Sequence, residues 1–130
     1  MGADMKRTPL IRRTPLRASR TPKRAARMLA EISAAQRADM QLHRTLVLQQ
    51  GCIVCYLEQH RYRHAEPHHL RHGMGAGMRN DDYHMIPLCA DHHRLGDAFH
   101  RWPERWQKAH GSEVELLRAV YKRLRKECPL

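Results

Sequence analysis

The sequence predicts a small α+β fold, in which two short strands lie between longer helices. Helix-forming residues with a rough 3.6-residue apolar period occupy residues 24–49, and a second amphipathic pattern occupies residues 112–127. Between them, residues 51–90 read as short strands and turns, with strands expected around Pro67–Leu70 and Met85–Leu88. The chain has 130 residues and only 5% aromatic side chains, so its core is small and we expect a further cross-link to stabilise it.

The predicted helices carry recognisable end signals. Gly51 is a natural stop for the first long helix. Ser112 precedes the last helix, and Glu115 stands three positions later, which is the spacing of a capping box. Asp91 suits the N-cap of a third helix, which we expect over about residues 92–100.

Residues 1–24 differ from the rest of the chain. An Arg-Thr-Pro motif occurs three times, prolines disfavour helix, and almost every charge is positive. This pattern predicts a disordered basic arm, which leaves residues 25–130 as the folded domain. The arm either solubilises the chain or follows a phosphate backbone. In the second case the candidate nucleic-acid contacts are Arg7, Arg12, Arg13 and Arg17.

The charge of the whole chain points the same way. The formal net charge is +11, which attracts polyanions, and nucleic acid is the first candidate. The sequence contains no apolar run long enough for a spanning helix and no secretory signal, so we expect no membrane partner and a cytoplasmic location.

Two ligand pairs predict a structural zinc site. Cys52 and Cys55 form a C-x-x-C pair, and Cys89 and His92 form a C-x-x-H pair. Tetrahedral zinc is commonly bound by two such pairs, and cysteines in a reducing compartment favour metal over disulfides. The alternative is that these are ordinary buried cysteines. Cys128 has no partner at a useful spacing.

Histidines are concentrated downstream of the first cysteine pair. The tandem pair His68-His69 precedes a glycine-rich loop, His84 precedes an apolar strand, and His93 directly follows the second ligand pair. This order resembles the HNH endonucleases, also called His-Me finger or ββα-metal nucleases. The resemblance implies a zinc-stabilised ββα-metal core between flanking helices, and an enzyme that hydrolyses phosphodiester bonds.

The resemblance also implies roles for single residues. His69 would be the general base, and an imidazole that is neutral near pH 7 suits this task. His68 and His93 would hold a catalytic Mg²⁺ or Mn²⁺ ion. The third ligand stays open between Asp97 and His100, which lie four and seven positions after His93 and so on the same face of the expected helix.

Two further roles stay open. The position of His84 is usually Asn in the family, where that residue orients the base. His84 can take this role through a hydrogen bond, or Asn80 can take it from the preceding loop. Arg71 and Arg94 flank the predicted site and are candidates for phosphate contacts, with a solvated surface position as the alternative.

A closer similarity covers about residues 50–125. It is carried by Pro67–Arg71, Gly75–Met78, Ile86–Cys89, His92-His93 and His100. These segments look like the Ref family of phage-encoded, RecA-dependent nucleases. The similarity favours His100 over Asp97 as the third ligand of the catalytic metal. It also implies DNA as substrate, a phage or prophage origin, a role in recombination or DNA processing, and a RecA filament as a candidate partner.

A second class of function competes with the nuclease. A zinc-containing DNA-binding accessory protein without catalysis would also need the Cys3His cluster and the basic charge. Only the nuclease needs His68, His69 and His93 together beside a second metal ion.

Overall fold

The computed structural model describes residues 23–75 and 80–130, with side chains from residue 33 onward. The element bounds are α1 Lys23–Gln49, α2 Ile53–Gln59, β1 Glu66–His69, β2 Met85–Leu88, α3 Ala90–His93, α4 Pro103–His110 and α5 Glu113–Leu124. The predicted α+β class is therefore confirmed. None of the described helices is both long and apolar enough to cross a bilayer. Most of the arm expected at residues 1–24, with its four candidate arginines, lies outside the described residues.

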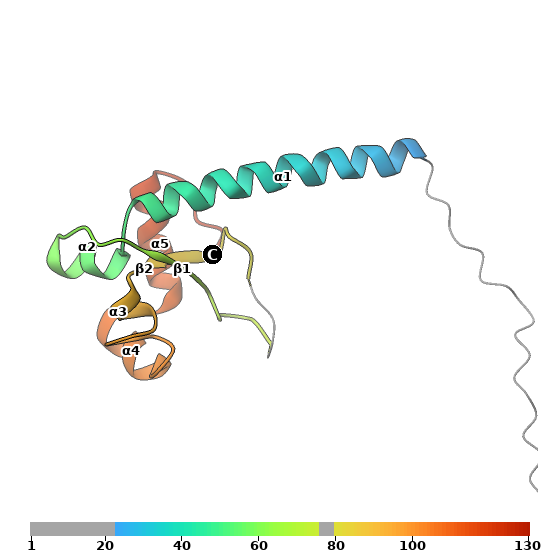
Figure 1. Ribbon diagram of the computed structural model, residues 1–130. Coiled ribbons are helices and arrows are strands. Elements are labelled where there is room, and N and C mark those ends of the chain that lie inside the picture. The colour runs from blue at the N-terminus through green and yellow to red at the C-terminus, as the bar shows by residue number, and fades with distance from the viewer. Residues whose placement is uncertain (1–22, 76–79) are drawn as a thin grey trace, which may run out of the picture.

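The two strands form an antiparallel hairpin at the centre of the fold. His68 lies opposite Ile86 and His69 lies opposite Met85. Figure 1 shows α5 behind this hairpin, α2 beside it, and α3 with α4 beyond its far end. All four residues of β2 are buried, because helices cover this strand. The hairpin therefore places β1, which carries the tandem histidines, within reach of both α3 and α5.

Helix α1 projects far beyond the hairpin (Figure 1). Its described side chains are exposed over residues 33–39, whereas His43 and Val47 near its end are buried. Among the described side chains of α1, those in its last turns contribute to the core. The rest of the core comes mainly from the following elements: α2 with Ile53 and Val54, β2 with Met85, Ile86 and Leu88, α4 with Trp106, and α5 with Leu116, Leu117 and Val120.

Helix α5 begins as the sequence predicts. Ser112 is the N-cap, and its hydroxyl accepts a hydrogen bond from the backbone N–H of Glu115. The Glu115 carboxylate accepts in return from the backbone N–H of Ser112, at 2.9 Å. This capping box fixes the first turn, and it thereby fixes the position of Glu113.

Two local predictions were wrong. Residues 53–59 were expected as strand and turn but form α2, because Ile53 and Val54 pack into the core as one helical turn and good helix formers follow. The helix expected over 92–100 ends at His93, and its N-cap is Cys89 instead of Asp91. The backbone N–H groups of Arg94 and Leu95 both bond to the Ala90 carbonyl, which closes the helix after one turn.

We expect Gly51→Ala to destabilise the fold by about 1–3 kcal/mol. Gly51 has φ +76°, and an added Cβ would lie 2.7 Å from Cδ2 of Tyr62 and 2.8 Å from the carbonyl oxygen of Arg63. That oxygen cannot move freely, because it accepts a hydrogen bond from the Cys52 N–H. Urea unfolding measures the loss. Gly73→Ala is the matched control, since Gly73 has φ +70° but open space around its Cα. Equal losses in the two variants would contradict the steric argument.

Candidate metal centres

The four predicted zinc ligands lie together. Nδ1 of His92 lies 3.5 Å from Sγ of Cys52, 3.6 Å from Sγ of Cys55 and 3.2 Å from Sγ of Cys89, and the last two sulfurs are 3.9 Å apart. A zinc ion with ligands at about 2.0–2.3 Å in a tetrahedron separates neighbouring ligand atoms by roughly 3.5–3.8 Å. The cluster therefore has the dimensions of a structural zinc site.

Local structure explains how the two pairs meet. Cys52 is the N-cap of α2 and Cys55 lies in its first turn, so both sulfurs project from the start of one helix. Cys89 and His92 repeat this arrangement at the start of α3. A shared metal would cross-link α2 to α3, which is the additional stabilisation that a small core requires.

The surroundings of the thiols also fit a metal. Burial and the neighbouring Cys52 raise the pKa of Cys55 to about 12, and burial raises the pKa of Cys52. Without a cation, buried thiols at such close distances stay protonated. A bound divalent cation reverses this preference, because thiolates are its ligands.

A second group of three histidines lies nearby. His68 on β1, His93 on α3 and His100 in the following loop each place a ring nitrogen within 4.8 Å of the other two. The Nε2 atoms of His93 and His100 are 3.0 Å apart. Adjacent ligands held at about 2.1 Å and near right angles around a metal are roughly 3.0 Å apart, so this spacing also fits a shared cation.

A buried glutamate fixes the ring of His68. Nε2 of His68 lies 2.9 Å from Oε1 of Glu113, and the same carboxylate accepts from the backbone N–H groups of Arg71 and His72 at 3.0–3.1 Å. Burial alone would raise the pKa of Glu113, but these hydrogen bonds outweigh it and lower that pKa. An ionised Glu113 therefore holds Nε2 of His68 as the donor and leaves Nδ1 as the lone-pair nitrogen.

Glu66 does the same for His93. Nδ1 of His93 lies 2.9 Å from Oε2 of Glu66, and this arrangement leaves Nε2 to face His100. Arg94 donates to both oxygens of Glu66, at 2.8–3.2 Å. These bonds from Arg94 and His93 hold the pKa of Glu66 at about 2. Arg94, a candidate phosphate contact, thus has its guanidinium already engaged by a carboxylate.

The candidate base His69 pairs with Asp82. Nε2 of His69 lies 2.7 Å from Oδ1 of Asp82, and the same oxygen accepts from Arg44 at 3.2 Å. Burial would raise the pKa of Asp82, but the bond to His69 and the charge of Arg44 lower it. An ionised Asp82 fixes His69 as the tautomer whose Nδ1 can accept a proton.

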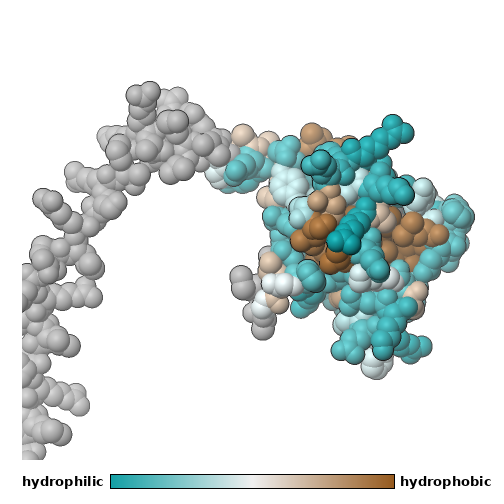
Figure 2. Space-filling model, turned by 180° about the vertical axis from the view of Figure 1, so that it is seen from behind, coloured by the Kyte–Doolittle hydropathy of each residue, from teal (hydrophilic) through white to brown (hydrophobic). Residues whose placement is uncertain are grey.

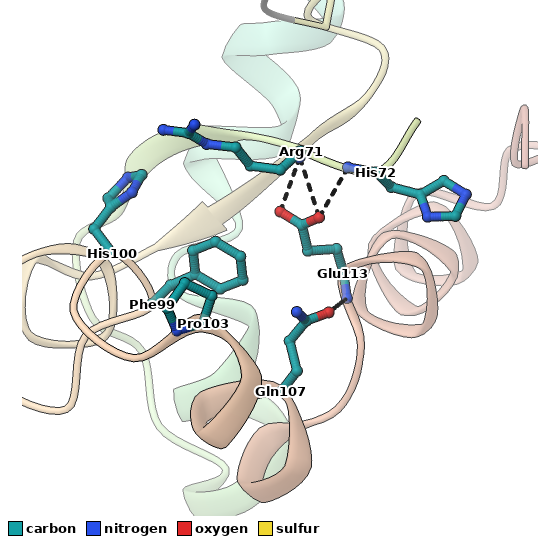
Figure 3. A pocket seen from close by; sticks show the side chains of 7 residues that line it. All are labelled: Arg71, His72, Phe99, His100, Pro103, Gln107 and Glu113. Atoms are coloured by element: carbon teal, nitrogen blue, oxygen red, sulfur yellow. Dashed lines mark hydrogen bonds between the residues drawn. The ribbon is translucent and has the colours of Figure 1, made fainter. Parts of the chain in front are cut away.

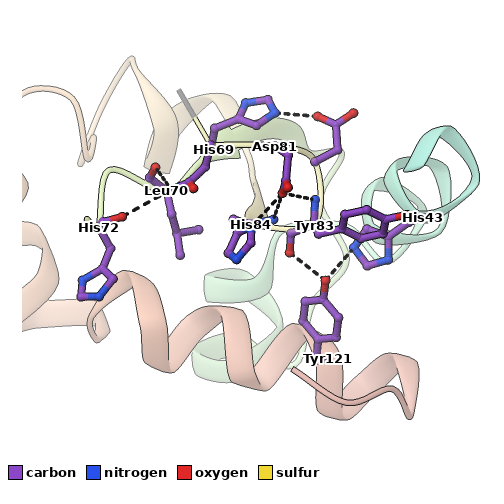
Figure 4. A network of polar contacts seen from close by, with 10 residues as sticks. His43, His69, Leu70, His72, Asp81, Tyr83, His84 and Tyr121 are labelled. Atoms are coloured by element: carbon purple, nitrogen blue, oxygen red, sulfur yellow. Dashed lines mark hydrogen bonds and ion pairs between the residues drawn. The ribbon is translucent and has the colours of Figure 1, made fainter. Parts of the chain in front are cut away.

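His84 and Asn80, the two residues expected to orient the base, bond to other groups, and Asp82 bonds to His69 instead. Nδ1 of His84 lies 2.7 Å from Oδ1 of Asp81 (Figure 4). Asn80 donates instead to the carbonyl oxygens of Leu70 and His72, at 2.8 Å and 3.4 Å, and so closes the loop between the strands. The sequence did not predict the role of Asp82, because a carboxylate in a loop has no characteristic spacing from the residue that it contacts.

Asp97 and His100, the two candidates for the third ligand, lie in different clusters. Asp97 pairs with Nε2 of His110, whose Nδ1 lies 2.6 Å from Glu58, so its carboxylate belongs to another cluster. His100 joins His68 and His93 instead. The helical spacing used to compare the two does not apply, because α3 ends at His93. A loop brings His100 back, with its N–H bonded to the His93 carbonyl at 3.4 Å.

We expect Glu113→Gln to weaken metal binding at the three-histidine group by about 10–100-fold. Glutamine keeps the size of the side chain but loses the charge that fixes His68, and its amide faces two N–H donors. Calorimetric titration of the chain with a second equivalent of zinc, after the Cys3His cluster is filled, measures the change. Glu115→Gln is the matched control, since Glu115 lies in the same helical turn and binds only the helix cap. Equal affinities in both variants would contradict the role of Glu113.

The fold and these clusters define a small α+β protein with a Cys3His group that can hold a structural metal such as zinc. The chain belongs to the family described as protein of unknown function (DUF968), whose model matches residues 22–124. No curated protein and no solved structure matches the chain significantly.

Proposed function

We propose that this protein is a metal-dependent HNH endonuclease that hydrolyses DNA phosphodiester bonds. The observation that carries the proposal is the convergence of His68, His93 and His100, with two of the three rings oriented by a carboxylate. Three imidazole nitrogens around one point are typical of a metal site with open coordination positions. A purely structural role gives no reason for such a second group beside a complete Cys3His cluster.

The finer fold assignment belongs to this proposal. The hairpin β1–β2 followed directly by α3 has the element order of a ββα-metal core. His68 and His69 end β1 and His93 lies on α3, which are the positions that the resemblance to HNH nucleases, and to the Ref family, requires. In this assignment the zinc cluster sets the orientation of α3 and thereby of His93.

The residues divide the chemistry between them. His68, His93 and His100 would hold a divalent cation, which supplies charge neutralisation at the scissile phosphate and at the leaving oxygen. His69, held by Asp82, takes the proton from the attacking water. Glu113 and Glu66 fix the tautomers and ring orientations of His68 and His93, so that the nitrogen away from each carboxylate is the one available to the metal.

The three imidazole ligands indicate which metal ion the site would prefer. Mg²⁺ and Mn²⁺ prefer oxygen ligands, whereas imidazole suits zinc and its neighbours in the transition series. Three histidines therefore favour an ion of intermediate softness such as Zn²⁺ over the harder Mg²⁺ or Mn²⁺ that the resemblance implies. All of these ions belong in the assay.

DNA is proposed as the substrate because of charge. The net charge is +11, and the face shown in Figure 2 is mostly hydrophilic, with apolar side chains gathered in smaller patches. The cytoplasmic setting, the phage or prophage origin and the RecA filament as partner rest on the resemblance to the Ref family alone. A non-catalytic zinc-containing DNA-binding protein is the second candidate, favoured by the same charge and the Cys3His group.

The test is a cleavage assay on supercoiled plasmid and on single-stranded circular DNA. The purified chain, loaded with structural zinc, is incubated with Zn²⁺, Mn²⁺ or Mg²⁺, with and without RecA and ATP. Nicked or linear products that depend on the added metal support the nuclease. DNA binding without any product in every condition would overturn it in favour of the accessory protein.

A further inference from the structure

A hollow opens directly beside the three-histidine group. Its volume is about 470 Å³, and it is lined by Arg71, His72, Phe99, His100, Pro103, Gln107 and Glu113. Figure 3 shows Phe99 and Pro103 on one side, Glu113 and Gln107 facing them, and the Arg71 side chain extending toward His100. His100 belongs both to the hollow and to the metal group, and Glu113 likewise lines the hollow and holds His68. A molecule in the hollow would therefore lie next to the proposed metal ion.

Two polar side chains that line the hollow, Arg71 and Gln107, have donor groups without a partner among the described residues. Among the described residues, the Arg71 guanidinium makes no hydrogen bond or ion pair, in contrast to Arg94, which Glu66 engages on both oxygens. The side-chain oxygen Oε1 of Gln107 accepts a hydrogen bond from the backbone N–H of Glu113 at 3.2 Å. The side-chain NH₂ group of Gln107 has no partner within the described part of the chain. The Glu113 carboxylate is already occupied by three donors.

These properties match one unit of a nucleic-acid strand. The exposed Pro103, beside the almost fully buried Phe99, suits the face of a base, a free amide suits a base edge, and a free guanidinium suits a phosphate. A lone phosphate would use only Arg71 and would leave Pro103 and the amide without a partner.

We propose that this hollow is a nucleoside-binding subsite that holds the nucleotide adjoining the scissile phosphate. This inference rests on the proposed nuclease function and extends it. Arg71 holds the phosphate of that nucleotide, Phe99 and Pro103 contact its base, and the Gln107 amide donates to the edge of the base. The substrate is then gripped on a single strand at the cut, because a base inside a duplex cannot enter the hollow while paired.

The test compares two strands of equal charge. Binding of the thymidine hexanucleotide and of an abasic deoxyribose-phosphate hexamer is measured by fluorescence anisotropy, with the full zinc-loaded chain carrying His69→Ala to prevent cleavage. We expect the thymidine strand to bind about fivefold or more tightly than the abasic strand. Amide NMR signals of Arg71 and His72 and the side-chain signal of Gln107 should shift with the thymidine strand. Equal affinity for the two strands would overturn the subsite.

Three variants in the same background separate the contacts. Arg71→Gln keeps the backbone N–H that binds Glu113 and is expected to weaken both strands alike. Gln107→Glu keeps the acceptor for the Glu113 N–H but lacks the amide donor. The ratio of the affinity for the thymidine strand to that for the abasic strand should therefore fall toward one. The added charge cancels in that ratio, because both strands carry the same phosphates. Arg105→Gln, on the exposed face of α4, is the control and should keep the ratio. A ratio in Gln107→Glu equal to that of Arg105→Gln would contradict the base contact.

The binding and cleavage experiments together distinguish a failure of the subsite from a failure of the proposed nuclease function. Base-dependent binding mapped to the hollow, without cleavage by the unmutated protein in any metal, would leave the subsite and remove the nuclease. Metal-dependent cleavage, with no base preference and no shift at Gln107, would leave the nuclease and remove the subsite.

Discussion

Cys89→Ser is expected to release zinc and to lower the free energy of unfolding by about 5 kcal/mol or more. Cys89 lies 3.9 Å from Sγ of Cys55 and 3.2 Å from Nδ1 of His92, so its loss removes one corner of the tetrahedron. Without the metal, only the small apolar core would hold α2 against α3. Because small domains are stable by only about 5–15 kcal/mol in total, much of the chain should unfold near physiological temperature.

Zinc content per chain and thermal unfolding are the two measurements for this prediction. Cys128→Ser is the matched control, since Cys128 is a free cysteine outside the cluster and only partly buried. It should keep one zinc and melt close to the unmutated chain. Loss of zinc from Cys89→Ser without a change in unfolding would show that the metal does not stabilise the fold. Retention of zinc would show that Cys89 is not a ligand.

His69→Ala is expected to reduce metal-dependent DNA cleavage by about 10²–10⁴-fold while the chain keeps its fold and its metal. Nε2 of His69 bonds to Asp82 at 2.7 Å, and His69 is not a member of the hydrophobic core cluster, so its truncation leaves the contacts within that cluster in place. The loss should fall on the rate of strand cleavage and spare DNA binding. Initial rates on plasmid, with bound metal and anisotropy measured in parallel, separate these effects.

His64→Ala provides the comparison for His69→Ala. His64 is an exposed histidine five positions earlier, outside both metal groups, and its removal should leave cleavage within about twofold. Asp82→Asn should fall between the two, because it leaves the base in place but no longer fixes its tautomer. Equal cleavage by His69→Ala and the unmutated protein would exclude His69 as the base, whatever the fate of the metal site.

The Cys3His group could be predicted from sequence because its spacing reflects local geometry. A cysteine at a helix start and a second ligand three positions later lie on the same turn, and this relation is visible in the letters of both pairs. The long helix α1, the strand β2 and the capping box of α5 were predictable for the same reason. Each depends on contacts among residues close together in the chain.

The carboxylates that orient the histidines could not be predicted in this way. Glu113 is 45 positions from His68, and Glu66 is 27 positions from His93, so only the folded chain brings them together. Asp82 lies in a loop beside Asp81, and the sequence does not say which of the two turns toward His69. His100 was favoured over Asp97 on the resemblance to the Ref family, and the helical face expected to carry both residues is absent, because α3 ends at His93 and a returning loop brings His100 to His68 and His93.

The position of Glu113 sets the smallest fragment that could work. The ligands of the Cys3His group and of the three-histidine group all lie between Cys52 and His100, so a fragment ending shortly after His100 would contain both ligand sets. It would still lack the carboxylate at the first turn of α5 that orients His68 and anchors the backbone at Arg71 and His72. Grafting the hairpin and α3 into another protein, or truncating the chain before α5, should therefore transfer the ligands without their geometry. The unit to transplant extends through α5.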